Sequence, residues 1–207
     1  MSGRPPRVAL TFDAEHPDRP AHVADGADRI LDVLAEAGAR ATFFVQGRWA
    51  LAEPEGARRI GTSGHLVGNH SHHHARLPGM TDEGIRADVL DAEAAVTEAT
   101  GVGPRPWFRC PFGAGHSDPR VRAVLDEIGY RDVGWHVAGE DWEPWRTGAD
   151  VARDVLARLD ERGRDTVVLL HTWPVSCVEG LGAILDGLAE RGVATVRIDE
   201  LPAESVP

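Results

Sequence analysis

Residues 165–173 read Asp-Thr-Val-Val-Leu-Leu-His-Thr-Trp, and this stretch decides the fold class. The run from Thr166 to Leu170 is the most hydrophobic strand-like segment of the chain. A short run of β-branched and apolar residues is typical of a buried strand. His171 would then lie at the carboxyl end of that strand, where parallel α/β folds collect their functional groups.

Strand-like runs alternate with helical patterns on both sides of this stretch. We predict strands at residues 8–12, 42–45, 66–67, 107–108, 133–137, 165–170 and 194–198. Apolar residues at helical spacing predict helices at residues 27–34, 57–60, 85–96, 121–128, 151–159 and 181–188. Thr81 is a suitable N-cap for the helix at 85–96, and Gly101 is its expected stop. This alternation predicts parallel strands covered by helices, either as an incomplete β/α barrel or as a doubly wound sheet.

Length, composition and charge narrow the class of protein. A chain of 207 residues predicts one α/β domain over residues 1–207, and 42% hydrophobic with 27% charged residues is typical of a globular protein. A formal net charge of -11 would repel nucleic acid and anionic membranes, so we expect neither as a partner. The N-terminus shows no hydrophobic signal core before the first strand, which predicts a cytoplasmic location.

Polar side chains follow five of the predicted strands. In chain order they are Asp13, Glu15 and His16; His70 to His74; Arg109 to Phe112; Glu140 to Trp142; and His171 to Trp173. Because parallel strands present their carboxyl ends at the same side of the fold, these carboxylates, imidazoles and the guanidinium should converge there.

The segment His70-Ser-His-His-His74 is the strongest local signal. On a helical turn, His70 and His74 would project from the same face, which suits capture of one transition-metal ion. A carboxylate from another strand would complete a three-ligand set. The alternative is an exposed histidine-rich loop without a metal. His72 and His73 would point away from His70 and His74 on such a turn, so we expect no metal role for them.

The remaining candidates each have a structural alternative. Asp13 can orient or deprotonate water at a metal, or simply cap a loop. His171 can protonate a departing amine, or be a half-buried structural histidine. Arg109 needs a carboxylate partner, and Asp141 is the obvious candidate in either a catalytic or a purely structural ion pair. Cys110 is a weak candidate nucleophile, because small buried cysteines are common in cores.

Taken together, these segments resemble the polysaccharide deacetylase family, the NodB-homology domain of carbohydrate esterases. The resemblance covers roughly residues 7–201 and all five family motifs in order. They are Thr11-Phe12-Asp13, His70-Ser71-His72-His73-His74, Arg109-Cys110-Pro111-Phe112, Asp141-Trp142 and Leu169-Leu170-His171.

The resemblance implies the family's distorted, incomplete (β/α)7 barrel and a catalytic set. Asp13 would be the catalytic base, His171 the general acid, and Arg109 would tune the base. Asp141 would orient His171 or Arg109. An amide nitrogen is a poor leaving group until it is protonated, so an acid is needed beside the base.

The resemblance also implies substrate and metal sites. His70 and His74 would hold a divalent metal, usually zinc, with cobalt, nickel, manganese or iron as alternatives. The substrate-binding residues would be Phe112, Trp142, Leu169 and Trp173. Leu169 would line the acetyl pocket, and a backbone N–H near Phe112 would stabilise the oxyanion. The tryptophans would either stack on a sugar ring or pack the rim.

The chain departs from the family pattern at the third metal ligand. The family usually has Asp-Asp in its first motif, whereas this chain has Asp13-Ala14-Glu15. Because Ala14 cannot bind a metal, we predict Glu15 as the third ligand, with His16 as a weaker candidate. The competing interpretation is a metal-poor branch of the family.

These observations predict a metal-dependent hydrolase that removes an N-acetyl or N-acyl group from an amino sugar, an oligosaccharide or a related small amide. Two other hypotheses stay open. One is hydrolysis of a cyclic imide or ureide on the same fold without a tightly held metal. The other is a non-catalytic glycan-binding homologue, against which the retained Asp13 and His171 argue.

Overall fold

The computed structural model describes residues 6–18, 23 and 25–207. Its contacts divide the chain into two compact units. We call residues 13–19 and 43–134 the central unit, and residues 1–12, 20–42 and 135–207 the terminal unit. The expectation of one domain over residues 1–207 stays a prediction.

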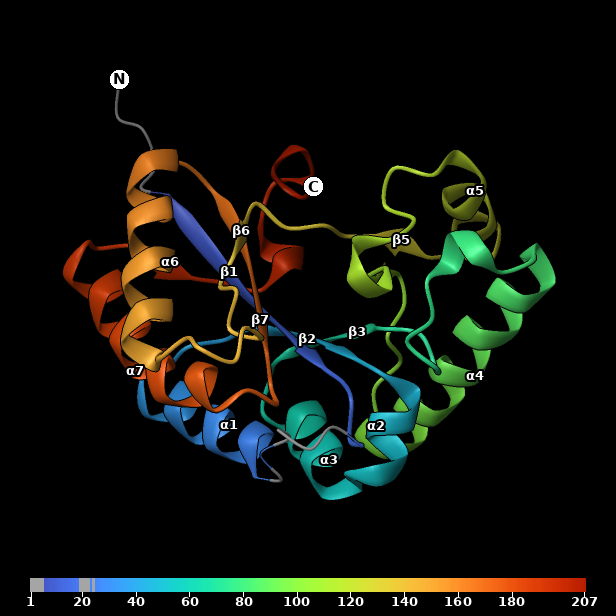
Figure 1. The fold of residues 1–207 in the computed structure, drawn as a ribbon, viewed down its shortest axis with the longest axis horizontal. Coiled ribbons are helices and arrows are strands. Elements are labelled where there is room, and N and C mark those ends of the chain that lie inside the picture. The colour runs from blue at the N-terminus through green and yellow to red at the C-terminus, as the bar shows by residue number, and fades with distance from the viewer. Residues whose placement is uncertain (1–5, 19–22, 24) are drawn as a thin grey trace. The chain divides into compact units, whose positions relative to one another are not determined.

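In the part that the structure describes, the terminal unit combines parallel strands with three helices. Its elements are β1 (Arg7–Ala14, whose last two residues belong to the central unit), α1 (Gly26–Glu36), β6 (Val137–Ala138), α6 (Gly148–Arg162), β7 (Thr166–His171), α7 (Val175–Glu190), β8 (Ala194–Thr195), and 3-10 turns at Ile198–Glu200 and Ala203–Ser205. β7 lies between β1 and β6, and the pairs β6–β7 and β1–β8 are parallel. The long helices α6 and α7 pack side by side, and α1 also contacts α7 (Figure 1).

The central unit also combines parallel strands with helices. Its elements are β2 (Thr42–Val45, whose first residue belongs to the terminal unit), α2 (Gly47–Ala52), α3 (Pro54–Thr62), β3 (Leu66–Asn69), α4 (Asp82–Thr100), β4 (Trp107–Phe108), α5 (Pro119–Glu127), β5 (Arg131–Asp132), and 3-10 turns at Leu77–Gly79 and Pro111–Gly113. The strands follow in the order β2, β3, β4, β5, and both β3–β4 and β4–β5 are parallel. Helix α4 contacts α2, α3 and α5 (Figure 1).

Apolar side chains at helical spacing place the helices. On α7 the buried residues include Leu181, Ile184, Leu185 and Leu188, as their spacing predicted. In the central unit a core cluster joins helix and strand residues: Leu77, Ile85, Val89, Phe108, Cys110, Val121, Val124, Leu125 and Tyr130. These cores fix the strand ends that carry the polar residues. Among the described residues, no helix has both the length and the apolar character needed to cross a membrane.

Two predicted strands were wrong in detail. Residues 133–137 do not form one strand, because β5 ends at Asp132 and β6 begins at Val137. The carbonyls of Val133 and Gly134 accept hydrogen bonds from the Arg109 side chain instead of continuing a strand ladder. The predicted helix at 57–60 is confirmed as part of α3, and the sequence did not predict α2 before it. The strand predicted at 194–198 is only two residues long before a 3-10 turn.

The two ends of α4 were predicted correctly and give a direct test of the local structure. The Thr81 hydroxyl accepts a hydrogen bond from the Gly84 N–H at 3.1 Å, and Gly101 ends the helix with φ of 73°. Thr81→Ala should lower the free energy of unfolding by about 1 kcal/mol, because one helix N–H loses its acceptor. Urea unfolding measures this change. Thr81→Ser keeps the cap and should stay close to wild type; equal stability of the alanine and serine variants would contradict the capping role.

Candidate metal centre and active site

The end of β1 delivers two carboxylates. Successive side chains of a strand point to opposite faces, so Asp13 and Glu15 project to the same side while Ala14 projects away. The Ala14 carbonyl accepts a hydrogen bond from the Gln46 N–H at 2.9 Å, which extends the strand-like geometry at this point. Both carboxylates are buried, each being 4% exposed. An Asp-x-Glu spacing therefore presents two acids to one side.

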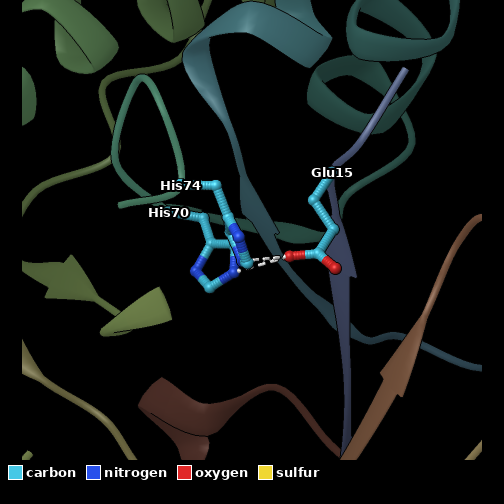
Figure 2. Close-up of side chains that lie close together, drawn as sticks. All are labelled: Glu15, His70 and His74. Carbon is cyan, nitrogen blue, oxygen red and sulfur yellow. Dashed lines mark hydrogen bonds and ion pairs between the residues drawn. The ribbon is translucent and has the colours of Figure 1, made fainter. Parts of the chain in front are cut away.

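The histidines lie on a loop after β3, and the expected helical turn was wrong. Ser71 and His74 have positive φ angles of 61° and 57°, so the backbone from 70 to 74 turns through left-handed residues. The Asn69 side-chain oxygen accepts from the Ser71 N–H at 2.8 Å, and the Ser71 hydroxyl accepts from the His74 N–H at 3.0 Å. These bonds fold the loop so that His70 and His74 still point the same way, as Figure 2 shows.

Asp88 anchors this loop from α4. One of its oxygens accepts from the His72 N–H and the other from the His73 N–H, each at 3.0 Å. None of the sequence motifs includes Asp88. A signal was present, because Asp88 occupies the position between Ile85 and Val89 on the apolar face of α4, and a charged residue there needs a buried partner.

Glu15, His70 and His74 form a compact set of three potential metal ligands. One ligand atom from each lies within 4.8 Å of the others, and all three residues are buried. The Glu15 Oε2 lies 3.1 Å from the His70 Nε2 and is also ion-paired to the His74 Nε2 (Figure 2). Two imidazoles and a carboxylate are a donor set that divalent transition metals accept.

The hydrogen bonds of the imidazoles fit the same role. The His70 Nδ1 lies 2.9 Å from the Arg109 carbonyl, to which it donates, and this leaves the Nε2 lone pair free for a metal. The His74 Nδ1 is buried and has no hydrogen-bond partner among the described residues. The His74 Nε2, which faces Glu15, is the nitrogen that this arrangement offers to a metal.

The charges around the two imidazoles differ. Burial lowers the pKa of His74, which favours the neutral ring that a metal requires. Burial alone would also lower the pKa of His70, but the Asp13 and Glu15 carboxylates outweigh it and raise the pKa. The carboxylates thus favour positive charge at this point, which is the condition for holding a cation.

Asp13 is held by Arg109. The Arg109 Nη1 donates to the Asp13 Oδ1 at 2.8 Å, and the other Asp13 oxygen, Oδ2, lies 3.4 Å from the His70 Nε2. The guanidinium is itself buried, stacks over the Phe44 ring at 4.1 Å, and is 1% exposed. We had expected Asp141 as its carboxylate partner; the structure pairs Arg109 with Asp13.

Asp141 pairs with His171 in the terminal unit. Its Oδ1 accepts from the His171 Nδ1 at 2.9 Å, and its Oδ2 accepts from the His171 N–H at 2.7 Å. The Ser176 hydroxyl donates to the Asp141 carbonyl at 2.8 Å. Of the two partners predicted for Asp141, this geometry supports orientation of the His171 imidazole, with the Nε2 left to face other groups.

The predicted substrate residues fall into two groups. Phe112 is 52% exposed, and its ring centroid lies 4.4 Å from that of His74, so it belongs to the surface beside the candidate metal centre. Trp142 and Trp173 flank the His171 ring at centroid distances of 5.3 and 6.0 Å. Trp173 and Leu169 are almost completely buried, at 4% and 3% exposed, so their role as substrate contacts stays a prediction.

His16 and Cys110 were the weaker candidates. The His16 Nε2 lies 3.2 Å from the Glu15 Oε1, the oxygen that does not face His70. The His16 backbone N–H donates to the Gln46 side-chain oxygen. His16 thus contacts the third ligand rather than joining the set of three. Burial raises the pKa of the Cys110 thiol far above its usual range, so this side chain is a poor nucleophile.

Comparison with known proteins decides the family. A family model described as polysaccharide deacetylase matches residues 2–133. The chain belongs to this family. It is 33% identical over 201 residues to the peptidoglycan-N-acetylglucosamine deacetylase PgdA of Listeria monocytogenes, which covers 97% of this chain and 40% of that protein. The chain thus spans less than half the length of this relative.

Solved structures of polysaccharide deacetylase relatives share the fold. A family 4 carbohydrate esterase from Streptomyces lividans, in complex with acetate, matches with a TM-score of 0.82 and 26% identity, covering 97% of this chain and 96% of that one. A family 4 pseudoenzyme from Bacillus anthracis matches with a TM-score of 0.81 and 26% identity, covering 94% and 64%. These likenesses confirm the predicted α/β fold class, the incomplete (β/α)7 barrel of polysaccharide deacetylases.

The role of Glu15 as a metal ligand can be measured directly. Glu15→Gln removes the negative charge and leaves a weak ligand of the same size. We expect metal affinity to fall by at least roughly 100-fold, because changes to residues behind the ligands already cost about 10- to 100-fold. Competition with a chelator measures the affinity. Glu98→Gln, at an exposed position on the same unit, is the control, and equal affinity of wild type and Glu15→Gln would contradict the assignment.

Proposed function

We propose that this protein is a metal-dependent hydrolase that removes the acetyl group from an N-acetylated amino sugar. One observation carries the proposal. A buried carboxylate, Asp13, is held by Arg109 immediately beside a set of three metal-ligand residues, Glu15, His70 and His74. A base next to a metal site is an arrangement that can catalyse amide hydrolysis. The deacetylase relative and the acetate-bound esterase structure support the same reaction class.

Asp13 is the proposed general base. Its Oδ1 is occupied by Arg109, so its Oδ2, on the side of His70, is the atom available to accept a proton from water. The ion pair fixes the carboxylate in one orientation, which reduces the entropy lost when the reactants come together. When bound, a divalent metal supplies Lewis acidity, lowering the pKa of water and polarising the amide carbonyl.

Zinc is the proposed metal. Glu15, His70 and His74 would hold it as three protein ligands, the number found in catalytic zinc sites, and would leave room for water or substrate. Cobalt, nickel, manganese and iron also accept this donor set, and metal availability would then decide between them.

His171 is the proposed general acid. This role rests on its place in the fifth motif of the polysaccharide deacetylase family and on the two hydrogen bonds by which Asp141 holds it within the terminal unit. With its Nδ1 donating to Asp141, the Nε2 is the atom through which a proton reaches the departing amine. Trp142 and Trp173 flank the ring and restrict its rotation.

The proposed substrates are N-acetylated amino sugars in small or oligomeric form. The exposed Phe112 ring beside His74 gives a sugar an apolar surface to stack on. A formal charge of -11 disfavours polyanionic partners such as nucleic acid. We also propose a cytoplasmic location, as the sequence predicts, and cell fractionation tests it.

Release of acetate from chitooligosaccharides tests the proposed reaction. We expect zinc-loaded protein to release acetate, and both chelation and Asp13→Asn to lower kcat by about 100- to 10,000-fold, the usual contribution of a general base. Asp186→Asn, on α7, is the matched control and should retain activity.

Other outcomes of this assay support the alternative functions. Hydrolysis of cyclic imides by metal-free protein would support the second hypothesis. Glycan binding without turnover in metal-loaded protein would place this chain with the pseudoenzymes of the polysaccharide deacetylase family.

A further inference from the structure

The loop between β4 and α5 carries Phe112 and follows an unusual backbone path. Phe112, Gly113 and Gly115 have positive φ angles of 58°, 64° and 116°. Phenylalanine rarely adopts this left-handed conformation, which persists only where the surrounding structure holds it. Hydrogen bonds inside the loop, such as Gly113 N–H to the Cys110 carbonyl at 2.9 Å, shape its turns, and the buried Cys110 side chain packs in the core cluster at one end. The rest of the loop, up to His116, needs a further anchor.

Asp132 supplies that anchor at both ends of the loop. The parallel register of β4 and β5 places Asp132 opposite Phe108, just before the loop begins. Its Oδ1 accepts from the Cys110 N–H at 2.9 Å, and its Oδ2 accepts from the His116 Nδ1 at 2.7 Å. The Asp132 side chain is 5% exposed, whereas that of His116 is 44% exposed. One buried carboxylate thus joins residue 110 to residue 116.

Gly134 makes room for the His116 ring. A Cβ at position 134 would come within 3.0 Å of the His116 Cε1, so a larger residue would displace the imidazole. The Gly134 carbonyl also accepts from the Arg109 Nη2 at 3.2 Å. The His116 ring therefore packs on the same backbone segment that orients Arg109, the partner of Asp13.

The anchored loop presents Phe112 to the candidate metal centre. The Phe112 ring lies edge to face with His74 at 4.4 Å, and the guanidinium of Arg76 lies over it at 4.6 Å. Because Phe112 is half-exposed, its own packing is too slight to fix its position. The constraint must come from the ends of the loop.

We propose that His116 and Asp132 form a positioning pair, which fixes the loop from Cys110 to His116 and so holds Phe112 beside His74 for substrate binding. This inference rests on the proposed deacetylation for its kinetic consequence, but its structural consequence is independent of any activity. None of the five family motifs includes His116 or Asp132.

The charges that face His116 come from three elements. The hydrogen bond to Asp132, on β5, is the main cause that raises the pKa of His116, while Arg122 on α5 and Arg109 after β4 lower it by a smaller amount. The pKa of His116 is higher in the folded protein than in the unfolded chain. The stability that the His116–Asp132 pair contributes is therefore fully present below the ordinary imidazole pKa, and it is lost as the pH rises through the pKa of His116 in the folded protein. The loop should accordingly loosen toward alkaline pH.

Hydrogen exchange followed by mass spectrometry tests the anchor without reference to activity. His116→Gln and Asp132→Asn should each speed exchange of the amides at residues 110–118, and leave those of α4 unchanged. Glu127→Gln is the matched control, since it removes an ion pair of the same 2.7 Å length, to Arg86, that does not touch the loop. Because His116 is half-exposed, its replacement is compatible with folding even if Asp132→Asn is not. Unchanged exchange in His116→Gln would overturn the proposal.

Kinetic measurements then distinguish a role of His116 in positioning Phe112 from a purely structural role. For acetate release by zinc-loaded protein, His116→Gln should lower kcat/KM by about 10- to 100-fold, the effect of a misplaced contact, with chelator-measured metal affinity unchanged. The fall in wild-type activity as pH rises through the His116 titration should be absent in the variant. Faster loop exchange with unaltered kcat/KM and pH profile would refute the positioning role. If the wild type releases no acetate, the proposed function fails, and the exchange result still decides whether the anchor exists.

Discussion

Negative charge buried at the end of β1 is the constraint on which the site depends. Asp13 and Glu15 are each 4% exposed, and an isolated buried carboxylate is strongly disfavoured. Arg109 compensates Asp13, while Glu15 faces two imidazoles. The carboxylate charge of Glu15 is thus better matched by a divalent ion held with both histidines than by the imidazoles alone. Retention of this buried acid where Ala14 has replaced the family's usual ligand is the main argument for a working metal site.

Buried carboxylates also organise the loops around the functional residues. Asp88 accepts the N–H groups of two loop histidines, Asp132 joins the two ends of the Phe112 loop, and Asp141 holds both the backbone and the ring of His171. In each case one side chain satisfies two donors. A loop held by short polar contacts at fixed points keeps its functional side chain in place without a large apolar core of its own.

The sequence predicted those features that depend on local periodicity and chemistry. β2 and both ends of α4 follow from β-branched runs, an N-cap and a glycine stop, and the five motifs identified the polysaccharide deacetylase family. The prediction of a strand at 133–137 was wrong, because the side chain of Arg109, distant in sequence, donates hydrogen bonds to the carbonyls of Val133 and Gly134. The helical turn expected at His70–His74 failed because Asn69 and Asp88 determine the loop. Asp132 and His116 lie 16 residues apart, and only the pairing of β4 with β5 brings them together.

The central claim is that Glu15 replaces the missing ligand at Ala14 in a functional metal centre. A crystal structure of the zinc-loaded protein, with anomalous diffraction recorded at the zinc edge, tests it most directly. We expect one ion about 2.0–2.2 Å from a Glu15 oxygen and from one nitrogen each of His70 and His74. An ion bound without Glu15, or no ion between these residues at saturating zinc, would contradict it.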